Sequence, residues 1–363
     1  MSIIRKFTAK IGFGERRRDG RVHVGYLDAS YWTGVEQKRV RVRDVSPTGV
    51  YVLTDDRWLP GTSVLLTLQN GHKRSLFEND VRPEVRMPAR TVRAGEDGVG
   101  LTFIQDHIKV ATWLKLMNMA TSLVVQNDAV RVFRVTKALA FLLRICPSCE
   151  GQVLKLITEG LNNERAERAI EVALRAEEML VSQYRTPCAD VPWGLVLHIL
   201  ENGSEIEDDR LLQSWGGMLA AASVEDSKPE AILRYIEILS ALDPSPVRIL
   251  TAACTKAMQA GWQSGFSFTA PLKCSMEEIK KIAGSRTTVG IEQDLNRLYQ
   301  MSLLEKSEKP NALEHIKEAN LTPTALGLRL YARCTGQIEV PDILDAAPPE
   351  ATASVAARPD AAT

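Results

Sequence analysis

The sequence predicts a multidomain β + α protein, in which a small antiparallel β-barrel or sandwich precedes an all-α region. Up to about residue 108, short runs alternate apolar and polar residues, as strands with one buried face require. Beyond that boundary, apolar residues recur three and four positions apart, as on one face of a helix. The charge changes there too: residues 1–108 carry 18 Lys and Arg against 13 Asp and Glu, and 109–363 carry 27 against 32.

The first part contains six runs with the pattern of strands. They are 22–26, 38–43, 50–54, 63–68, 85–94 and 99–104. Turn residues such as Pro60-Gly61 separate these runs, so each strand is short. In 38–43 we expect Val40 and Val42 to face the interior and the neighbouring arginines, Arg39, Arg41 and Arg43, to face outward.

The second part contains several amphipathic helices. The clearest apolar stripe lies in 163–181 and consists of Ala166, Ala169, Ile170, Ala173 and Leu180. Glu164 precedes Arg168 by four positions, a spacing that favours an ion pair on a helix. Further stripes follow at 212–222 and 232–239, and prolines break the chain after the second. We expect Trp215, in the first of these, to be a buried packing residue.

These patterns predict five segments. They are an N-terminal extension (1–11), a β-barrel (12–107), an α-helical domain (109–264), a winged-helix-like module (265–338) and a disordered tail (339–363) rich in Ala, Pro and Thr. The extension has apolar residues at helical spacing with basic residues between them. We expect it to dock on the barrel rather than on a membrane, because a single short helix binds membranes weakly.

Composition excludes several classes of protein. Of the 363 residues, 45% are apolar and 25% charged, which are values of a globular chain. The 45 basic residues balance the 45 acidic ones, so a uniformly basic nucleic-acid binder is excluded. No apolar run reaches the ~18 residues of a membrane span, and the start lacks the pattern of a signal peptide. We therefore expect a cytoplasmic protein.

Two short motifs mark a candidate binding site in the β part. Residues 15–21 read Glu-Arg-Arg-Arg-Asp-Gly-Arg, which places Arg17 and Arg21 in an RxxxR spacing just before the first strand. Residues 44–49 read Asp-Val-Ser-Pro-Thr-Gly, which is DxSxxG between the second and third predicted strands. Each motif is common by itself, but the two in this order within a β pattern are fairly specific.

This pair of motifs resembles the PilZ domain, a bacterial receptor for cyclic di-GMP, over residues 12–107. The runs RVHV after the arginines and GVGLTFI at the end are also similar to that family. The resemblance implies a cyclic di-GMP site formed by Arg17, Arg21, Asp44, Ser46 and Gly49, with Arg16 as an additional contact. Gly20 departs from the family, in which many members have proline at this position, and the departure bears mainly on affinity.

The residue types suit such a ligand on chemical grounds. A cyclic dinucleotide presents two phosphates and guanine edges with adjacent N7 and O6 acceptors, and the arginine fork matches either of them. Arginines on a flexible strand entry can close over the ligand. Asp44 and Ser46 can hydrogen-bond a guanine edge from a turn, for which we expect Gly49 to supply the backbone freedom.

The helical part indicates interaction with other molecules. Residues 206–223 and 231–250 resemble, weakly, the Abi-alpha family, which is associated with phage abortive infection, so a phage-defence protein is one alternative. Residues 275–336 are similar to a winged helix, with Ile279 and Ile282 in one helix and Ile291, Leu295, Leu298 and Leu303 in the next. A winged helix indicates either that the module binds a protein partner or that it binds DNA under the control of the nucleotide. Because 275–338 carry 9 basic and 8 acidic residues, we favour the protein partner.

No motif indicates catalysis, a cofactor or a metal. The five histidines have no metal-binding spacing, and we expect His198, in the run LVLHIL, to be a core residue. The single CxxC at Cys146 and Cys149 lacks a second pair for zinc, so two thiols at a helix end are expected. No nucleophile elbow, P-loop or dinucleotide fingerprint is present. The sequence therefore predicts a receptor and not an enzyme.

Overall fold

The computed structural model describes thirteen stretches of the chain. They are residues 22–23, 27–70, 84–104, 110–123, 128–153, 155, 164–183, 185–187, 190–224, 229–261, 272–284, 287–306 and 318–336. The chain divides into two compact units, one of residues 1–207 and 222–229 and the other of 208–221 and 230–363. The predicted extension (1–11) and tail (339–363) lie outside the described residues.

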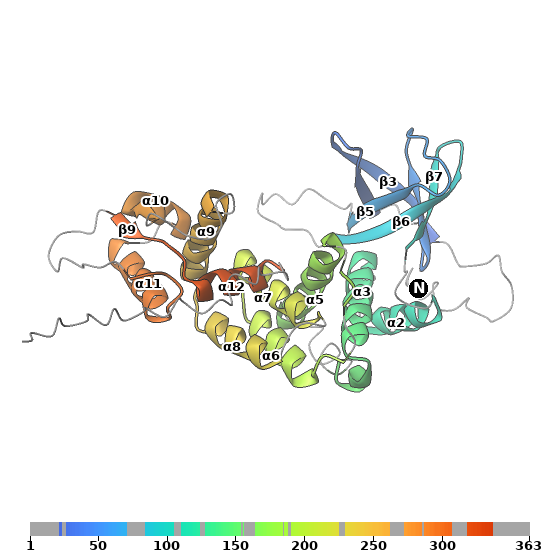
Figure 1. Ribbon diagram of the computed structural model, residues 1–363. Coiled ribbons are helices and arrows are strands. Elements are labelled where there is room, and N and C mark those ends of the chain that lie inside the picture. The colour runs from blue at the N-terminus through green and yellow to red at the C-terminus, as the bar shows by residue number, and fades with distance from the viewer. Residues whose placement is uncertain are drawn as a thin grey trace, which may run out of the picture. The chain divides into compact units, whose positions relative to one another are not determined.

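The first unit begins with a closed antiparallel barrel (Figure 1). Its strands are β1 (Val22–His23), β2 (Leu27–Trp32), β3 (Gln37–Ser46), β4 (Gly49–Leu53), β5 (Ser63–Asn70), β6 (Glu84–Ala94) and β7 (Gly98–Phe103). They follow the order β1-β3-β2-β5-β6-β7-β4. An additional β3–β4 pairing joins the two ends, so six strands form the barrel and β1 adds to the edge of β3. The predicted barrel is confirmed.

The barrel core follows the expected alternation. Val40 and Val42 are buried in β3, whereas Arg39 and Arg41 are exposed. The pattern did not reveal β2, the strand over Leu27–Trp32. Its inward residues are Leu27, Ala29 and Tyr31. The apolar alternation of this strand is hard to recognise in the sequence, because Ala29 is small and Tyr31 carries a hydroxyl, which hydrogen-bonds to Thr54.

Four α-helices and a short 3₁₀ helix complete the described part of the first unit. They are α2 (Val110–Leu123), α3 (Ala129–Ile145), η1 (Pro147–Cys149), α5 (Glu164–Ser182) and α6 (Trp193–Ser204). The predicted helix at 163–181 is α5, and Glu164 and Arg168 form the expected ion pair at 3.6 Å. The prediction for His198 was wrong, because this side chain is exposed on α6 while its neighbours Ile199 and Leu200 fill the core.

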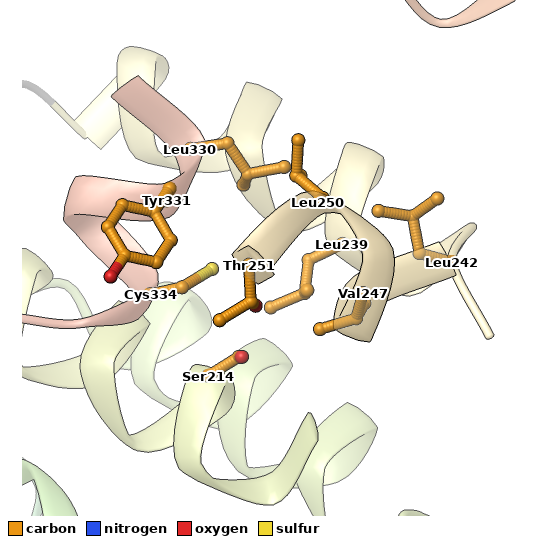
Figure 2. Close-up of a pocket in the computed structure, with 9 residues that line it drawn as sticks. All are labelled: Ser214, Leu239, Leu242, Val247, Leu250, Thr251, Leu330, Tyr331 and Cys334. Carbon is orange, nitrogen blue, oxygen red and sulfur yellow. The ribbon is translucent and has the colours of Figure 1, made fainter. Parts of the chain in front are cut away.

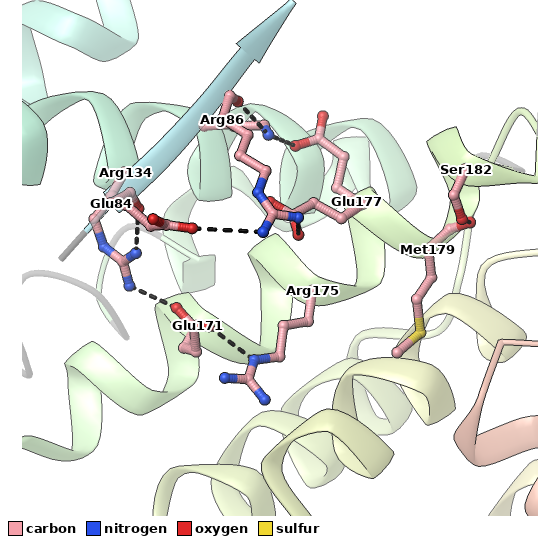
Figure 3. A network of polar contacts seen from close by, with 10 residues as sticks. Glu84, Arg86, Arg134, Glu171, Arg175, Glu177, Met179 and Ser182 are labelled. Carbon is pink, nitrogen blue, oxygen red and sulfur yellow. Dashed lines mark hydrogen bonds and ion pairs between the residues drawn. The ribbon is translucent and has the colours of Figure 1, made fainter. Parts of the chain in front are cut away.

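The helix α3 lies against the open edge of β6. Among the described residues, the first half of β6 pairs only with β5, since the pairing of β6 with β7 begins at Ala89. Along this edge, Arg134 donates to the carbonyl of Glu84 at 2.6 Å (Figure 3). Lys137 donates to the carbonyl of Arg86 at 2.9 Å. Two cations of α3 thereby satisfy backbone acceptors that a neighbouring strand would otherwise bond.

The same face of α3 is tied to α5 by ion pairs. These pairs are Arg131–Glu167 (2.5 Å), Arg134–Glu171 (2.6 Å) and Lys137–Glu177 (3.5 Å), and Arg175 adds a second partner for Glu171 at 2.7 Å. Figure 3 shows the central part of this network, with the Glu171 carboxylate between two guanidinium groups. The carboxylates of α5 therefore hold the cations that contact β6.

The second unit is mainly helical. Its elements are α7 (Asp209–Ala222), α8 (Pro229–Ser240), α9 (Pro244–Gly261), β8 (Lys273–Ser275), α10 (Met276–Ala283), α11 (Thr288–Gln300), β9 (Glu318–Asn320) and α12 (Ala325–Cys334). Trp215 is buried as predicted, at 1% exposure. Leu303 is buried beyond the end of α11 and not on it, which corrects the predicted extent of that helix. Within the described residues, every helix is too short or too polar to cross a membrane.

Cys146 and Cys149 lie at the end of α3 and on η1, as expected of a helix end. The structure joins them in a disulfide and does not leave two thiols, which corrects the prediction.

Candidate functional site

The DxSxxG motif joins two strands of the barrel at one end. Asp44 and Ser46 are among the last residues of β3, and Gly49 is the first residue of β4. The Asp44 and Ser46 residues are each 6% exposed. We expected these side chains on a turn, but they stand on strand ends, and only Pro47 and Thr48 form the connection. The structure therefore brings the three described residues of the predicted site together on a rigid support.

The connection between β3 and β4 is held by hydrogen bonds from three directions. The carbonyl of Thr48 accepts from the backbone N–H of Phe103 at 2.8 Å and from the hydroxyl of Thr102 at 3.0 Å, both in β7. The Ser46 hydroxyl donates to the carbonyl of Gly49 at 3.2 Å. From α2, the indole Nε1 of the buried Trp113 donates to the carbonyl of Pro47 at 2.9 Å. Such bonding preorganises the motif, which reduces the ordering cost of binding a ligand.

The reason we expected for glycine at position 49, backbone freedom in a turn, was wrong. Its φ does not lie in the left-handed region. A Cβ at this position would instead approach the carbonyl oxygen of Leu101 to 2.3 Å. Glycine is required because β7 passes close to the backbone of β4, where Gly49 pairs with Thr102.

Beside Asp44 lies a cluster of three side chains that belong to neither motif. Arg43 donates from Nε to Asp44 Oδ2 at 3.0 Å and from a terminal nitrogen to Asp97 at 3.1 Å. Its guanidinium carbon lies 3.4 Å from the centre of the Tyr51 ring, a cation–π contact. The Tyr51 hydroxyl donates to Asp97 at 2.8 Å. We call Arg43, Tyr51 and Asp97 the Arg43 cluster.

The cluster carries perturbed acid–base groups. Burial raises the pKa of Tyr51, and its hydrogen bond to the Asp97 carboxylate raises it further. The Tyr51 hydroxyl in turn lowers the pKa of Asp97 below its ordinary value, and Arg43 adds to this effect. Near neutral pH the cluster therefore consists of a carboxylate, a neutral phenol and a guanidinium.

Two features of the fold create the cluster. A bulge in β3 shifts the register between Val42 and Asp44, so both Arg43 and Asp44 lie on the outer side of the barrel. On β7, Gly98 and Gly100 offer no side chain to the Tyr51 ring, and a Cβ on Gly98 would lie 3.0 Å from that ring. The sequence signal was the Gly-rich run before and within β7, which we had used only for the strand pattern and the family resemblance.

The arginines of the predicted site, Arg16, Arg17 and Arg21, lie outside the described residues. The strand that follows them is described in part. In β1, Val22 pairs with Val45 and His23 pairs with Asp44. The chain therefore enters the barrel alongside the DxSxxG motif, and Arg21 directly precedes Val22.

A second candidate, an apolar pocket in the second unit, does not offer a comparable site. Its lining comes from α7, α9, α12 and the end of α8, and consists of Ser214, Leu239, Leu242, Val247, Leu250, Thr251, Leu330, Tyr331 and Cys334 (Figure 2). The pocket has room for little more than a water molecule. Burial raises the pKa of the Cys334 thiol to about 12, so this thiol is not an activated nucleophile.

Metal ligation finds no support in the parts of the chain described above. Across these residues, no group of three or more His, Cys, Asp or Glu side chains is placed to hold an ion.

Comparison with known proteins identifies the first unit's barrel. Residues 15–115 match the PilZ domain family. The match covers both motifs and the Arg43 cluster. It extends into α2 to residue 115 and so includes Trp113. PilZ domains form a family of cyclic di-GMP receptors. A comparison with curated proteins finds no match.

Proposed function

Because residues 15–115 carry a PilZ domain, we propose that this chain is a receptor for cyclic di-GMP. Arg16, Arg17 and Arg21 bind the ligand from the segment before β1, and Asp44 and Ser46 bind it from the end of β3. The observation that supports this most directly is the register of β1, which sets Val22 opposite Val45. The strand that directly follows RxxxR in the chain is thus the neighbour of the strand that ends in DxSxxG.

The chemistry of the two motifs is complementary. Cyclic di-GMP is a dianion, and arginine forks bind phosphate oxygens or the N7 and O6 acceptors of guanine in pairs. A carboxylate only accepts hydrogen bonds, so the side chain of Asp44 suits the N1–H and N2–H donors on the opposite edge of guanine. The hydrogen bonds that join the β3–β4 connection to β7 and α2 keep these acceptors in place before the ligand arrives.

Calorimetric titration of the full chain with cyclic di-GMP tests this function. We expect saturable binding by the wild type. In Arg17→Ala and Arg21→Ala, the loss of a desolvated charged contact should weaken binding by about 2–5 kcal/mol. Arg41→Ala is the matched control, since this exposed arginine of β3 has the same charge but lies outside both motifs. No heat from the wild type, or equal affinity in the two motif variants and the wild type, would overturn the proposal.

We further propose that ligand binding is passed to the helices of the first unit. Trp113 of α2 bonds the carbonyl of Pro47, which lies between Ser46 and Gly49 of the motif. The barrel also contacts α3 through Arg134 and Lys137 at β6. A shift of the β3–β4 connection on binding would therefore change the contacts of α2. Coupling of this kind requires that the ligand bind one arrangement more tightly than the other.

For the second unit we propose a winged-helix-like module that binds a protein partner. The α10–α11 pair and the antiparallel β8–β9 ladder support this assignment. Charge gives no support to a DNA-binding role for α11. Asp294 is buried and accepts from the Ser245 hydroxyl at 2.5 Å, and Arg297 is paired with Asp243 at 2.9 Å. DNA affinity depends on exposed cations that neutralise phosphates, and α11 does not present a row of them.

A further inference from the structure

We propose that the Arg43 cluster positions Asp44 for recognition of the ligand. In this role Arg43, Tyr51 and Asp97 act through Asp44 and are positioning residues for the guanine edge. The inference rests on the proposed cyclic di-GMP site and extends it to three residues outside the two motifs.

The guanidinium of Arg43 is held by three partners. Asp97 accepts two hydrogen bonds from the same terminal nitrogen, at 3.1 and 3.2 Å, and the Tyr51 ring supports one face of the group at 3.4 Å. The group therefore has little freedom to rotate. Its Nε donates to Asp44 Oδ2 at 3.0 Å, which ties one carboxylate oxygen of Asp44 to a fixed donor.

Asp97 completes the arrangement from a distant part of the chain. It belongs to the connection between β6 and β7 and orients both other members, because it accepts from Arg43 and from the Tyr51 hydroxyl. The neighbouring Gly95 leaves room for that hydroxyl, since a Cβ there would lie 2.1 Å from it. The connection thereby fixes a side chain of the binding motif on β3.

The position of Asp97 is unfavourable for a dianionic ligand on electrostatic grounds alone. It is 54% exposed and is separated from Asp44 by a single guanidinium. Removing a negative charge so close to the site should strengthen binding of an anion if charge were the only effect. A positioning role predicts the opposite result. The sign of the change in affinity therefore distinguishes the two explanations.

The decisive variant is Asp97→Asn in the full chain, titrated calorimetrically with cyclic di-GMP. We expect its dissociation constant to rise about tenfold, the equivalent of one oriented charged hydrogen bond, with unchanged stoichiometry. Partial unfolding would lower the stoichiometry instead. Arg43→Lys keeps the charge but loses the flat fork, and we expect a similar weakening.

Asp56→Asn is the matched control. Asp56 also accepts from a tyrosine hydroxyl of the barrel, that of Tyr31, and from a cation, Lys38. This variant removes the same charge from the same kind of contact outside the motif, and we expect its affinity to equal or slightly exceed that of the wild type.

The outcomes separate this inference from the proposed function. If the wild type does not bind, the proposed function fails and the positioning role fails with it. If the wild type binds and Asp97→Asn binds as tightly or more tightly at full stoichiometry, only the positioning role is overturned. Equal weakening in Asp97→Asn and Asp56→Asn would also overturn it, because the effect would then be general to the barrel.

Discussion

Trp113 connects the binding motif with the helices through one hydrogen bond. Its ring is 3% exposed and its Nε1 donates to the carbonyl of Pro47 at 2.9 Å. The contact joins residues 66 positions apart in the chain, so no local pattern in the sequence indicates it. The consequence is that the conformation of the motif depends on a residue of α2.

Replacing this tryptophan by phenylalanine tests the bond. Trp113→Phe keeps much of the apolar contact and removes the donor, so the free energy of unfolding should fall by about 1–3 kcal/mol, since a buried carbonyl loses its partner. Urea denaturation measures the change. Trp32→Phe is the control: this ring is 65% exposed, and we expect a change within about 0.5 kcal/mol. Equal stability of Trp113→Phe and the wild type would contradict the assigned bond.

The sequence predicted the part of the site that is contiguous in the chain. DxSxxG lies within six residues, and the alternation around it placed the motif between strands. The Arg43 cluster could not be predicted in this way. Asp97 lies 54 positions from Arg43, and a bulge, which period-two alternation does not contain, turns Arg43 and Asp44 to the same side. His198 shows the opposite error, since an apolar run was taken for a buried face while the helix exposes one residue of it.

At the scale of elements, α3 and α5 form a charged interface beneath the barrel. Arg134 is central to it, because it bonds both the Glu84 carbonyl of β6 and the carboxylate of Glu171. Glu171 is largely buried, and burial acts to raise its pKa. The charges and hydrogen bonds of Arg134 and Arg175 outweigh burial and lower the pKa below its ordinary value.

The lowered pKa predicts a dependence of stability on pH. A carboxylate whose pKa is lowered by folding stabilises the fold above its unfolded pKa of about 4.3, and this contribution is lost as the pH falls through the lower folded value. Glu171→Gln should therefore lower the free energy of unfolding by about 2 kcal/mol at pH 7. This loss lies between those expected for breaking an exposed ion pair and a fully buried one. The cost should shrink as the pH falls below about 4.

Urea denaturation at several pH values between 7 and 3 measures this dependence. Glu150→Gln is the control, because its ion pair with Lys115 is exposed on both sides, and we expect a cost below about 1 kcal/mol. A cost for Glu171→Gln that stays constant down to pH 3 would show that its charge does not stabilise the fold.

At the scale of the molecule, the neutral composition arises from two parts of opposite charge. The segment before residue 109 is positive and the remainder is negative by the same amount. The arginines of the predicted site are among the residues that give the first segment its excess of positive charge. A balanced total charge is therefore compatible with a local site for a dianion, and the binding of such a ligand should weaken with salt.

Hydrogen exchange of the full chain with and without cyclic di-GMP tests transmission beyond the barrel. We expect slower exchange at residues 44–49 and in α2 over 110–123, because Trp113 links the two. Mass spectrometry of the peptides measures this. The Arg17→Ala variant, at a ligand concentration that saturates only the wild type, is the control. Protection confined to residues 10–50 would show that the signal stays within the barrel.

The docking of α3 on β6 also affects where a fragment that contains the barrel can end. A fragment that stopped after β7 would lack Arg134 and Lys137, and the carbonyls of Glu84 and Arg86 would lose these donors. An unprotected strand edge is a template for pairing with another chain, and such edges promote aggregation. The helix thus covers that edge of β6, and we expect a barrel expressed without α3 to associate through β6.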